Sequence, residues 1–213
     1  LTVVVDDMDM GITDVIRGDD HLNNTPRQIN ILKALCTEIP KYAHIPMILA
    51  PDGKKLSKRD GAVSVLQYRD EGYLPEALLN YLVRLGWSKG DQEIFSIDEM
   101  ISAFDIRDVN KSASSINPEK FLWLNQHYIK NTNSALLVKP LSILLQAMDI
   151  SLEHGPDLED LVDVQKQRTD TLKDMAEQSV VFYKDFDDYD ANVAKKHLRP
   201  VILEPLMALY ETL

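Results

Sequence analysis

The chain has 213 residues, of which 45% are hydrophobic and 27% are charged, a composition typical of a globular protein with more than one core. No window approaches about 18 uninterrupted apolar residues and no signal-peptide pattern opens the sequence, so we expect no membrane span and a cytoplasmic location. A single cysteine, Cys36, excludes an internal disulfide and any multi-cysteine metal site. The net charge of −11 argues against a surface that coats nucleic acid, so any RNA contact must use local basic patches.

The first fifty residues carry the pattern of an α/β unit. Residues 1–5 are apolar and β-branched, which predicts a strand whose exposed edge would favour pairing with another chain. Residues 12–16 predict a second short strand, and the apolar run at residues 45–50 predicts a third. A helix between the last two strands gives the order strand–helix–strand, so these two strands should be parallel.

The helix of this unit has a clear predicted start. Thr25 is a good N-cap residue, Pro26 suits the first helical position, and Gln28 completes a capping box. Proline cannot continue a helix, so Pro40 is expected to end it.

Two polar segments follow the ends of the predicted parallel strands. One is Arg-Gly-Asp-Asp-His at residues 17–21, and the other is a loop at residues 51–61 with four cations within six positions, Lys54 to Arg59. Glycines at both ends of the cationic stretch allow sharp turns. Because ligands of open α/β sheets bind beyond the carboxyl ends of the strands, we expect the two segments to form one site.

The cationic loop is suited to holding polyphosphate while negative charge moves onto a leaving group. The alternative is a solvated basic turn, because lysine is mostly exposed in proteins. A Walker A loop is excluded, since Ile48 stands where that pattern needs glycine, and Lys55 follows Lys54 where it needs serine or threonine.

From residue 63 onward the sequence predicts helices. Ser96 with Glu99 forms a capping box, and Asn117 caps a later helix in which Trp123 is expected to pack in the core. The polar stretch at residues 131–134 is a predicted boundary. Helices are expected at residues 65–71, 75–85, 97–104, 118–130, 134–149, 158–178 and 191–199, with a last one from about residue 201.

The basic loop carries a family resemblance. Its Lys-Leu-Ser-Lys-Arg at residues 55–59 resembles the KMSKS signature of class I aminoacyl-tRNA synthetases, with Leu56 in place of Met and Arg59 in place of the last Ser. The longer string at residues 52–62 is similar to the form found in bacterial glutamyl-tRNA synthetases, as is the string at residues 15–28. Further matches extend the resemblance over residues 1–130, namely at 5–7, 10–11, 75–82, 85–87 and 121–125.

This resemblance implies an α/β plus all-α fold in three parts. Residues 1–62 would form the second half of a Rossmann-like catalytic domain, 63–131 a helical stem-contact domain, and 132–213 the start of a helical anticodon-binding domain. None of the five histidines belongs to a His-x-Gly-His string, the other ATP-binding signature of the family. We therefore expect that this chain alone does not activate glutamate.

The implied activity is ATP-dependent ligation of glutamate to tRNA(Glu) through glutamyl-adenylate, as part of a longer enzyme. In the family, the lysine at the position of Lys58 contacts phosphate, so Lys58 is the first candidate catalytic residue and Lys55 the second. Ser57 would hold the turn of the loop or contact phosphate. Magnesium is expected to arrive with ATP rather than in a protein cage, and no structural zinc is expected.

The resemblance also assigns substrate contacts. Arg17 would hold a carboxylate of glutamate, whereas the alternative is a surface arginine paired with a neighbouring aspartate. Asp20 and His21 would lie near ATP or the terminal adenosine of the tRNA, or else form only a polar loop end. Arg168 occupies a position where the family often has an arginine that reads the third anticodon base, although it could equally pair with a nearby acid.

Three other functions remain open. A short synthetase paralogue glutamylates a modified tRNA base, but it lacks the anticodon-binding domain that the helices beyond residue 131 suggest. Glutaminyl-tRNA synthetase has a β-barrel C-terminal half, whereas residues 134–213 are predicted to be helical. A non-catalytic helical RNA-binding or interaction fragment is the alternative from another class. The partners expected are tRNA(Glu), glutamate and ATP, with no membrane, and the full-length protein is expected to be a monomer.

Overall fold

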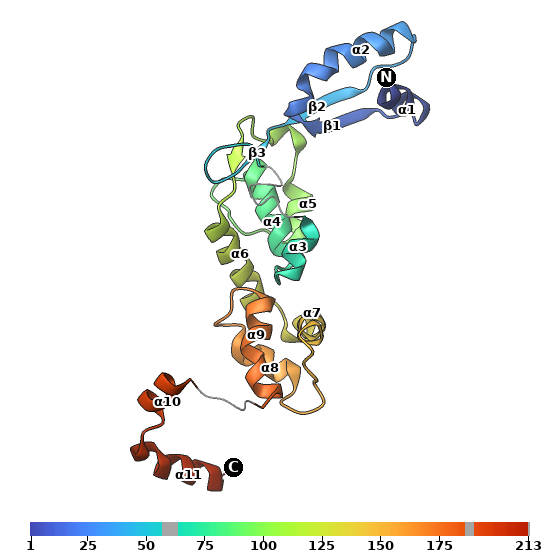
Figure 1. Cartoon of the computed structure of the whole chain (residues 1–213). Helices are drawn as coiled ribbons and strands as arrows, with labels where there is room; N and C mark the ends of the chain where they lie inside the picture. Colours follow the sequence, from blue (N-terminus) through green and yellow to red (C-terminus); the bar gives the residue numbers. More distant parts are fainter. Residues whose placement is uncertain (57–63, 186–189, 213) are drawn as a thin grey trace.

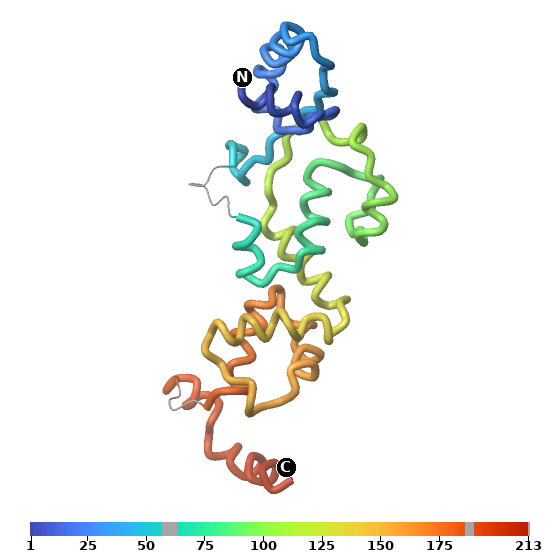
Figure 2. The backbone as a smooth tube through the Cα atoms, turned by 90° about the vertical axis from the view of Figure 1, so that its right-hand side faces the viewer, coloured from blue at the N-terminus to red at the C-terminus, as the bar shows by residue number. Residues whose placement is uncertain are grey.

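The computed structural model describes residues 1–56, 64–185 and 190–212, and all structural statements concern these residues. Figure 1 and Figure 2 show an elongated molecule with the N-terminal α/β unit at one end and the last helices at the other. Within the described ranges, no helix has both the length and the apolar character needed to cross a bilayer.

The α/β unit contains one parallel strand pair. Strands β1 and β2 pair in parallel, with Asp14 opposite Lys41 and Gly18 opposite Ile45. The elements of this unit are α1 (Thr2–Asp9), β1 (Asp14–Gly18), the 3-10 helix η1 (Asp19–Asn24), α2 (Thr25–Ala34) and β2 (Lys41–Ile45).

Residues 2–5 are helical and Leu1 is the N-cap residue of α1, so the predicted strand and its exposed pairing edge are wrong. Helix α1 lies against α2, and the side chains of Val4 and Leu32 are each only 2% exposed. The valines favour a strand when considered alone, but strand propensity depends strongly on packing. The helical arrangement buries Val4 in this unit.

The start of α2 also differs from the prediction. The N-cap position is Asn24, which makes no side-chain cap, and Thr25 already has helical backbone angles. The capping box of Thr25 and Gln28 is therefore wrong, because η1 leads directly into α2 and the Thr25 hydroxyl contacts other side chains. The helix ends at Ala34, before Pro40 is reached.

The apolar run at residues 45–50 does not form the strand that pairs with β1. Only β3 (Ile48–Leu49) is extended there, and it pairs in parallel with β4 (Ser114–Ser115), so the strand that leads into the basic loop belongs to a second small sheet. Parallel pairing with β1 comes from β2, earlier in the chain.

The middle of the molecule is helical, as predicted. The capping box at Ser96 and Glu99 is confirmed, with the Ser96 N–H donating to Glu99 Oε2 at 2.7 Å, and Asn117 caps α6 by accepting from a backbone N–H at 3.0 Å. Trp123 is 49% exposed, so its predicted core position is wrong; the buried face of α6 carries other residues. The elements are α3 (Val65–Asp70), α4 (Pro75–Gly86), α5 (Ile97–Ala103), the 3-10 helix η3 (Ile106–Asp108) and α6 (Pro118–Asn131).

The remaining elements are also helices. The prediction of a single helix at residues 158–178 is wrong, because this region contains two helices separated by residues 166–171. Thr171 caps the second of these helices by accepting a hydrogen bond from the Asp174 N–H at 3.0 Å. The elements are α7 (Ser134–Ala147), α8 (Leu158–Gln165), α9 (Leu172–Tyr183), α10 (Ala191–His197), the 3-10 helix η4 (Pro200–Ile202) and α11 (Leu203–Thr212).

One hydrophobic core runs through α4, α6, α7, α8 and α9. At its centre Asn125 is fully buried, accepts the Leu74 N–H through Oδ1 at 2.8 Å and donates through Nδ2 to the Asp170 carbonyl at 2.6 Å. Close by, the Leu172 N–H donates to the Gly72 carbonyl at 2.9 Å. These bonds fix the segment that contains Arg168 against the middle helices.

Candidate functional site

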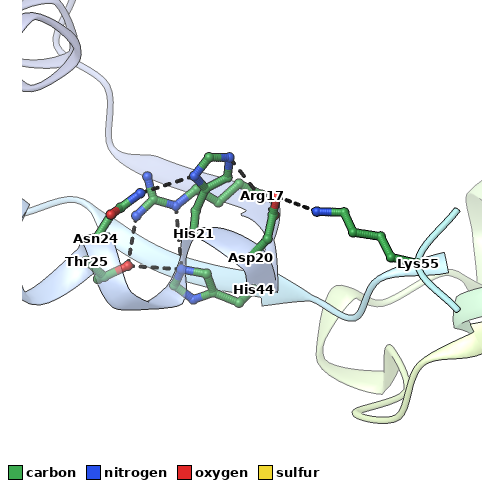
Figure 3. A network of polar contacts seen from close by, with 7 residues as sticks. All are labelled: Arg17, Asp20, His21, Asn24, Thr25, His44 and Lys55. Atoms are coloured by element: carbon green, nitrogen blue, oxygen red, sulfur yellow. Dashed lines mark hydrogen bonds and ion pairs between the residues drawn. The ribbon is translucent and has the colours of Figure 1, made fainter. Parts of the chain in front are cut away.

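The two polar segments singled out in the sequence lie together at the carboxyl end of β1. Lys55, which follows β3, has its ammonium 3.7 Å from Asp20 Oδ2 in η1, and Figure 3 shows these side chains pointing toward one another. The side chains of Lys55 and Asp20 are 62% and 42% exposed, so both are accessible to a ligand. The structure thus brings the start of the basic loop to the segment that contains Arg17 and His21.

Arg17 is held by side chains of the same α/β unit. Its Nη2 donates to Thr25 Oγ1 at 2.8 Å, and its Nε faces His44 Nε2 at 3.5 Å (Figure 3). The guanidinium carbon also lies 5.3 Å from the ring centroid of Tyr42, a cation–π distance. Within the described part of the chain, Arg17 has no carboxylate partner, so the alternative of a surface arginine paired with a neighbouring aspartate is wrong.

Asp20 and His21 form the accessible edge of η1. His21 Nε2 lies 4.0 Å from Asp20 Oδ1, and the other ring nitrogen lies 3.3 Å from Asn24 Nδ2. A Cβ atom on Gly18 would come within 2.7 Å of Asp20 Oδ1, so glycine allows this carboxylate to fold back toward the end of β1. The sequence indicated Asp20 and His21 but gave no role to Gly18.

The start of the basic loop is a tight turn. Gly53 has φ of +80°, a left-handed conformation that glycine adopts at low cost, and the Ala50 N–H donates to the Lys54 carbonyl at 2.8 Å. The Lys54 ammonium pairs with Asp52 at 2.7 Å, which lowers the pKa of the Asp52 carboxyl. Lys54 is therefore engaged within the turn, whereas Lys55 points to Asp20.

Two of the predicted site residues, Ser57 and Lys58, lie outside the described residues. Arg168 is an exposed residue of the segment between α8 and α9, which is bonded to the middle helices through Gly72 and Asn125. Among residues 1–56, 64–185 and 190–212, no three His, Cys, Asp or Glu side chains are grouped as metal ligands would be.

Sequence reasoning missed Thr25, His44 and Tyr42 as partners of Arg17. In the sequence, the position of Thr25 before Pro26 indicates only a helix cap, and no motif marks His44 or Tyr42. The register of the parallel pair carries the missing signal, because it places His44 directly opposite Arg17. Tyr42 lies two residues earlier on the same strand and therefore on the same face of β2.

Two family models match the sequence. Residues 1–123 match the model of the class I tRNA synthetases (E and Q), catalytic domain, and residues 133–213 match a model of an anticodon binding domain. The catalytic-domain model therefore covers the α/β unit and most of the middle helices.

Individual proteins are similar over the whole chain. A glutamate–tRNA ligase 1 of Coxiella burnetii is 60% identical over 213 residues, which is 100% of this chain and 45% of that protein. One of Nitrosococcus oceani is 61% identical over 211 residues, 99% of this chain and 45% of that protein. The crystal structure of a glutamate tRNA ligase from Elizabethkingia meningosepticum in complex with its amino acid aligns with a TM-score of 0.78 at 31% identity, covering 99% of this chain and 46% of that one.

The chain thus spans less than half the length of the relatives that it matches. The catalytic-domain model nevertheless covers more than half of the residues of this chain. The parallel pair of β1 and β2 and the start of the basic loop after β3 both lie inside that match. The chain belongs to the class I tRNA synthetases of the E and Q group.

Proposed function

We propose that this chain is part of a longer glutamate–tRNA ligase, which joins glutamate to tRNA(Glu) at the expense of ATP. The observation that carries the proposal is the meeting of the Arg17 segment and the basic loop through Lys55 and Asp20 at the end of a parallel strand pair. The names of the relatives support the choice of amino acid.

The chemistry needs alignment and charge neutralisation more than a protein base. A carboxylate oxygen of glutamate attacks the α-phosphorus of ATP, the bond to the bridging oxygen breaks, and pyrophosphate leaves with the electron pair. A terminal hydroxyl of the tRNA then attacks the acyl carbon of the adenylate and releases AMP. Preorganised cations beside the phosphates are worth most while charge develops on the leaving group.

Each site residue has a role in this proposal. Arg17 binds a carboxylate of glutamate, because a planar guanidinium matches two oxygens. Lys58 and Lys55 neutralise the phosphates, and Ser57 holds the loop or contacts phosphate. Asp20 and His21 lie near ATP or the terminal adenosine of the tRNA in this proposal.

Magnesium enters with ATP in this proposal, since the cation normally keeps most of its ligands on phosphate and water. No structural zinc is required. The longer enzyme acts as a monomer in the cytoplasm, where its partners tRNA(Glu), glutamate and ATP are found.

The domain division follows the same proposal. Residues 1–62 complete the catalytic domain, residues 63–131 contact the tRNA stem, and residues 132–213 begin the anticodon-binding domain, in which Arg168 inspects the third anticodon base. The paralogue that modifies a tRNA base is disfavoured because residues 133–213 match an anticodon-binding model.

The experiment is aminoacylation of purified tRNA(Glu) by the full-length protein with radiolabelled glutamate. The proposal expects incorporation that depends on ATP and is lost when the terminal adenosine of the tRNA is removed. Incorporation that persists without that adenosine would instead indicate glutamylation of a base. A complete lack of incorporation would favour a non-catalytic RNA-binding or interaction protein.

A further inference from the structure

We infer that Thr25 and His44 are positioning residues that hold the Arg17 guanidinium in one orientation, with one edge free for a substrate carboxylate. The inference rests on the proposed function, in which Arg17 binds glutamate. It adds two residues that do not contact the substrate but determine how Arg17 meets it.

The three side chains form a directed relay. Thr25 Oγ1 lies 2.8 Å from Arg17 Nη2 and 3.0 Å from His44 Nε2 (Figure 3). Arginine can only donate hydrogen bonds, so the Thr25 oxygen accepts from Arg17. The single hydroxyl hydrogen then points to His44 Nε2 at 3.0 Å, and the Arg17 Nε–H shares the same lone pair at the longer distance of 3.5 Å. This arrangement requires the imidazole hydrogen on Nδ1.

The relay is anchored in the fold. Thr25 is the first residue of α2 and is only 9% exposed, while His44 pairs directly with Arg17 across β1 and β2. The Tyr42 ring lies 5.3 Å from the guanidinium carbon. Arg17 is thus contacted from a helix and from the neighbouring strand. A long, flexible side chain held in this way loses less conformational freedom when a ligand binds.

The N–H groups of Arg17 that do not contact Thr25 or His44 determine which ligand Arg17 can bind. A guanidinium has five N–H groups; one on Nη2 goes to Thr25, and the one on Nε faces His44. Among the residues that the structure describes, both Nη1 hydrogens and the second Nη2 hydrogen have no partner. This edge fits the two oxygens of a carboxylate in a bidentate contact, whereas an uncharged amide offers it only one oxygen. The relay thereby favours glutamate over glutamine.

The test compares Thr25→Val, which has nearly the same shape but no hydroxyl, with Thr25→Ser, which restores the hydroxyl. Both are made in the full-length protein and assayed by tRNA-dependent ATP–pyrophosphate exchange. We expect Thr25→Val to raise the KM for glutamate about tenfold, the scale of one hydrogen bond to a charged group, with the KM for ATP changed less than about twofold. Thr25→Ser should return the KM for glutamate to within about threefold of wild type.

A second pair keeps the test decisive if Thr25→Val melts below the assay temperature. His44→Phe removes the acceptor of the relay, whereas His44→Gln supplies an amide oxygen at a similar reach. We expect the KM for glutamate to rise severalfold in His44→Phe and to recover in His44→Gln, while the KM for ATP stays within about twofold.

Arg17→Ala separates the two proposals. If it leaves the KM for glutamate unchanged, the proposed role of Arg17 is wrong and the relay has no function in binding. If it raises that KM while Thr25→Val and His44→Phe do not, only the relay is overturned. An equal rise of the KM for glutamate and for ATP in the variants would also overturn it, because general disruption of the fold affects both.

Discussion

Asn125 is predicted to be important for the stability of the helical part. Replacing it with alanine removes the partners of the buried Leu74 N–H and of the Asp170 carbonyl, which Asn125 now satisfies at 2.8 Å and 2.6 Å. A buried polar group left without a partner costs about 1–3 kcal/mol, so the two together cost about 2–6 kcal/mol. The half-exposed position of Asp170 favours the lower part of this range, and we expect a loss of about 3 kcal/mol.

The measurement is urea unfolding of wild type and Asn125→Ala, followed by circular dichroism at neutral pH. Asn131→Ala is the matched control, because this asparagine lies at the exposed end of the same helix and should change the free energy of unfolding by less than about 0.5 kcal/mol. A loss below about 1 kcal/mol for Asn125→Ala would refute the reasoning, since the two backbone groups would then have found other partners. Equal effects of the two variants would refute it as well.

Three further predictions concern separate parts of the molecule. In the full-length protein, Lys58→Ala should slow glutamyl-adenylate formation by a factor on the order of 10² to 10³, while ATP binding weakens far less. The rate is measured by ATP–pyrophosphate exchange, and an unchanged exchange rate would contradict the role of Lys58. Arg168→Gln should change the ratio of charging between glutamate and glutamine tRNAs, and an unaltered ratio would leave Arg168 structural. A hydrogen bond from Arg107 holds the pKa of the Asp105 carboxyl at about 2, below its ordinary value of 3.8. The ionised Asp105 carboxylate therefore stabilises the folded protein above about pH 4, and this stabilisation is lost as the pH falls toward 2. The difference in melting temperature between wild type and Asp105→Asn should therefore become smaller as the pH falls from about 4 to 2. A difference that stays constant over this pH range would contradict the lowered pKa of Asp105.

Local signals in the sequence predicted much of the fold. The order strand–helix–strand indicated a parallel pair, although its second strand is β2 at residues 41–45 and not the apolar run at residues 45–50. The capped helices at Ser96 and Asn117 have side chains of the right type at the right spacing. These elements could be predicted because the residues that determine them lie within a few positions of one another.

The errors occurred where distant packing decides the structure. Residues 1–5 have strand propensity, but residues 2–5 are helical because this conformation buries Val4 beside α2. Trp123 lies among apolar residues in the sequence, yet the face of α6 that joins the core is set by its contacts with other helices. The loop that separates α8 from α9 is likewise fixed by its bonds to Asn125 and Gly72, which lie far away in the sequence.

For the candidate site, the motifs led to Arg17, Asp20 and Lys55 and to their shared location at a strand end. They did not lead to Thr25 and His44. These two residues contact Arg17 only because β2 pairs with β1 in a particular register and α2 starts at its observed position. Register depends on packing across the whole unit, so spacing along the chain did not reveal it.

The central claim is that the full-length protein selects and activates glutamate. ATP–pyrophosphate exchange in the presence of tRNA(Glu), measured separately with glutamate, glutamine and aspartate, tests it most directly. The account predicts that glutamate supports exchange and that glutamine and aspartate do not, with the rate at limiting glutamate falling sharply in Arg17→Ala. Exchange that is independent of glutamate, or equal with glutamine, would contradict it.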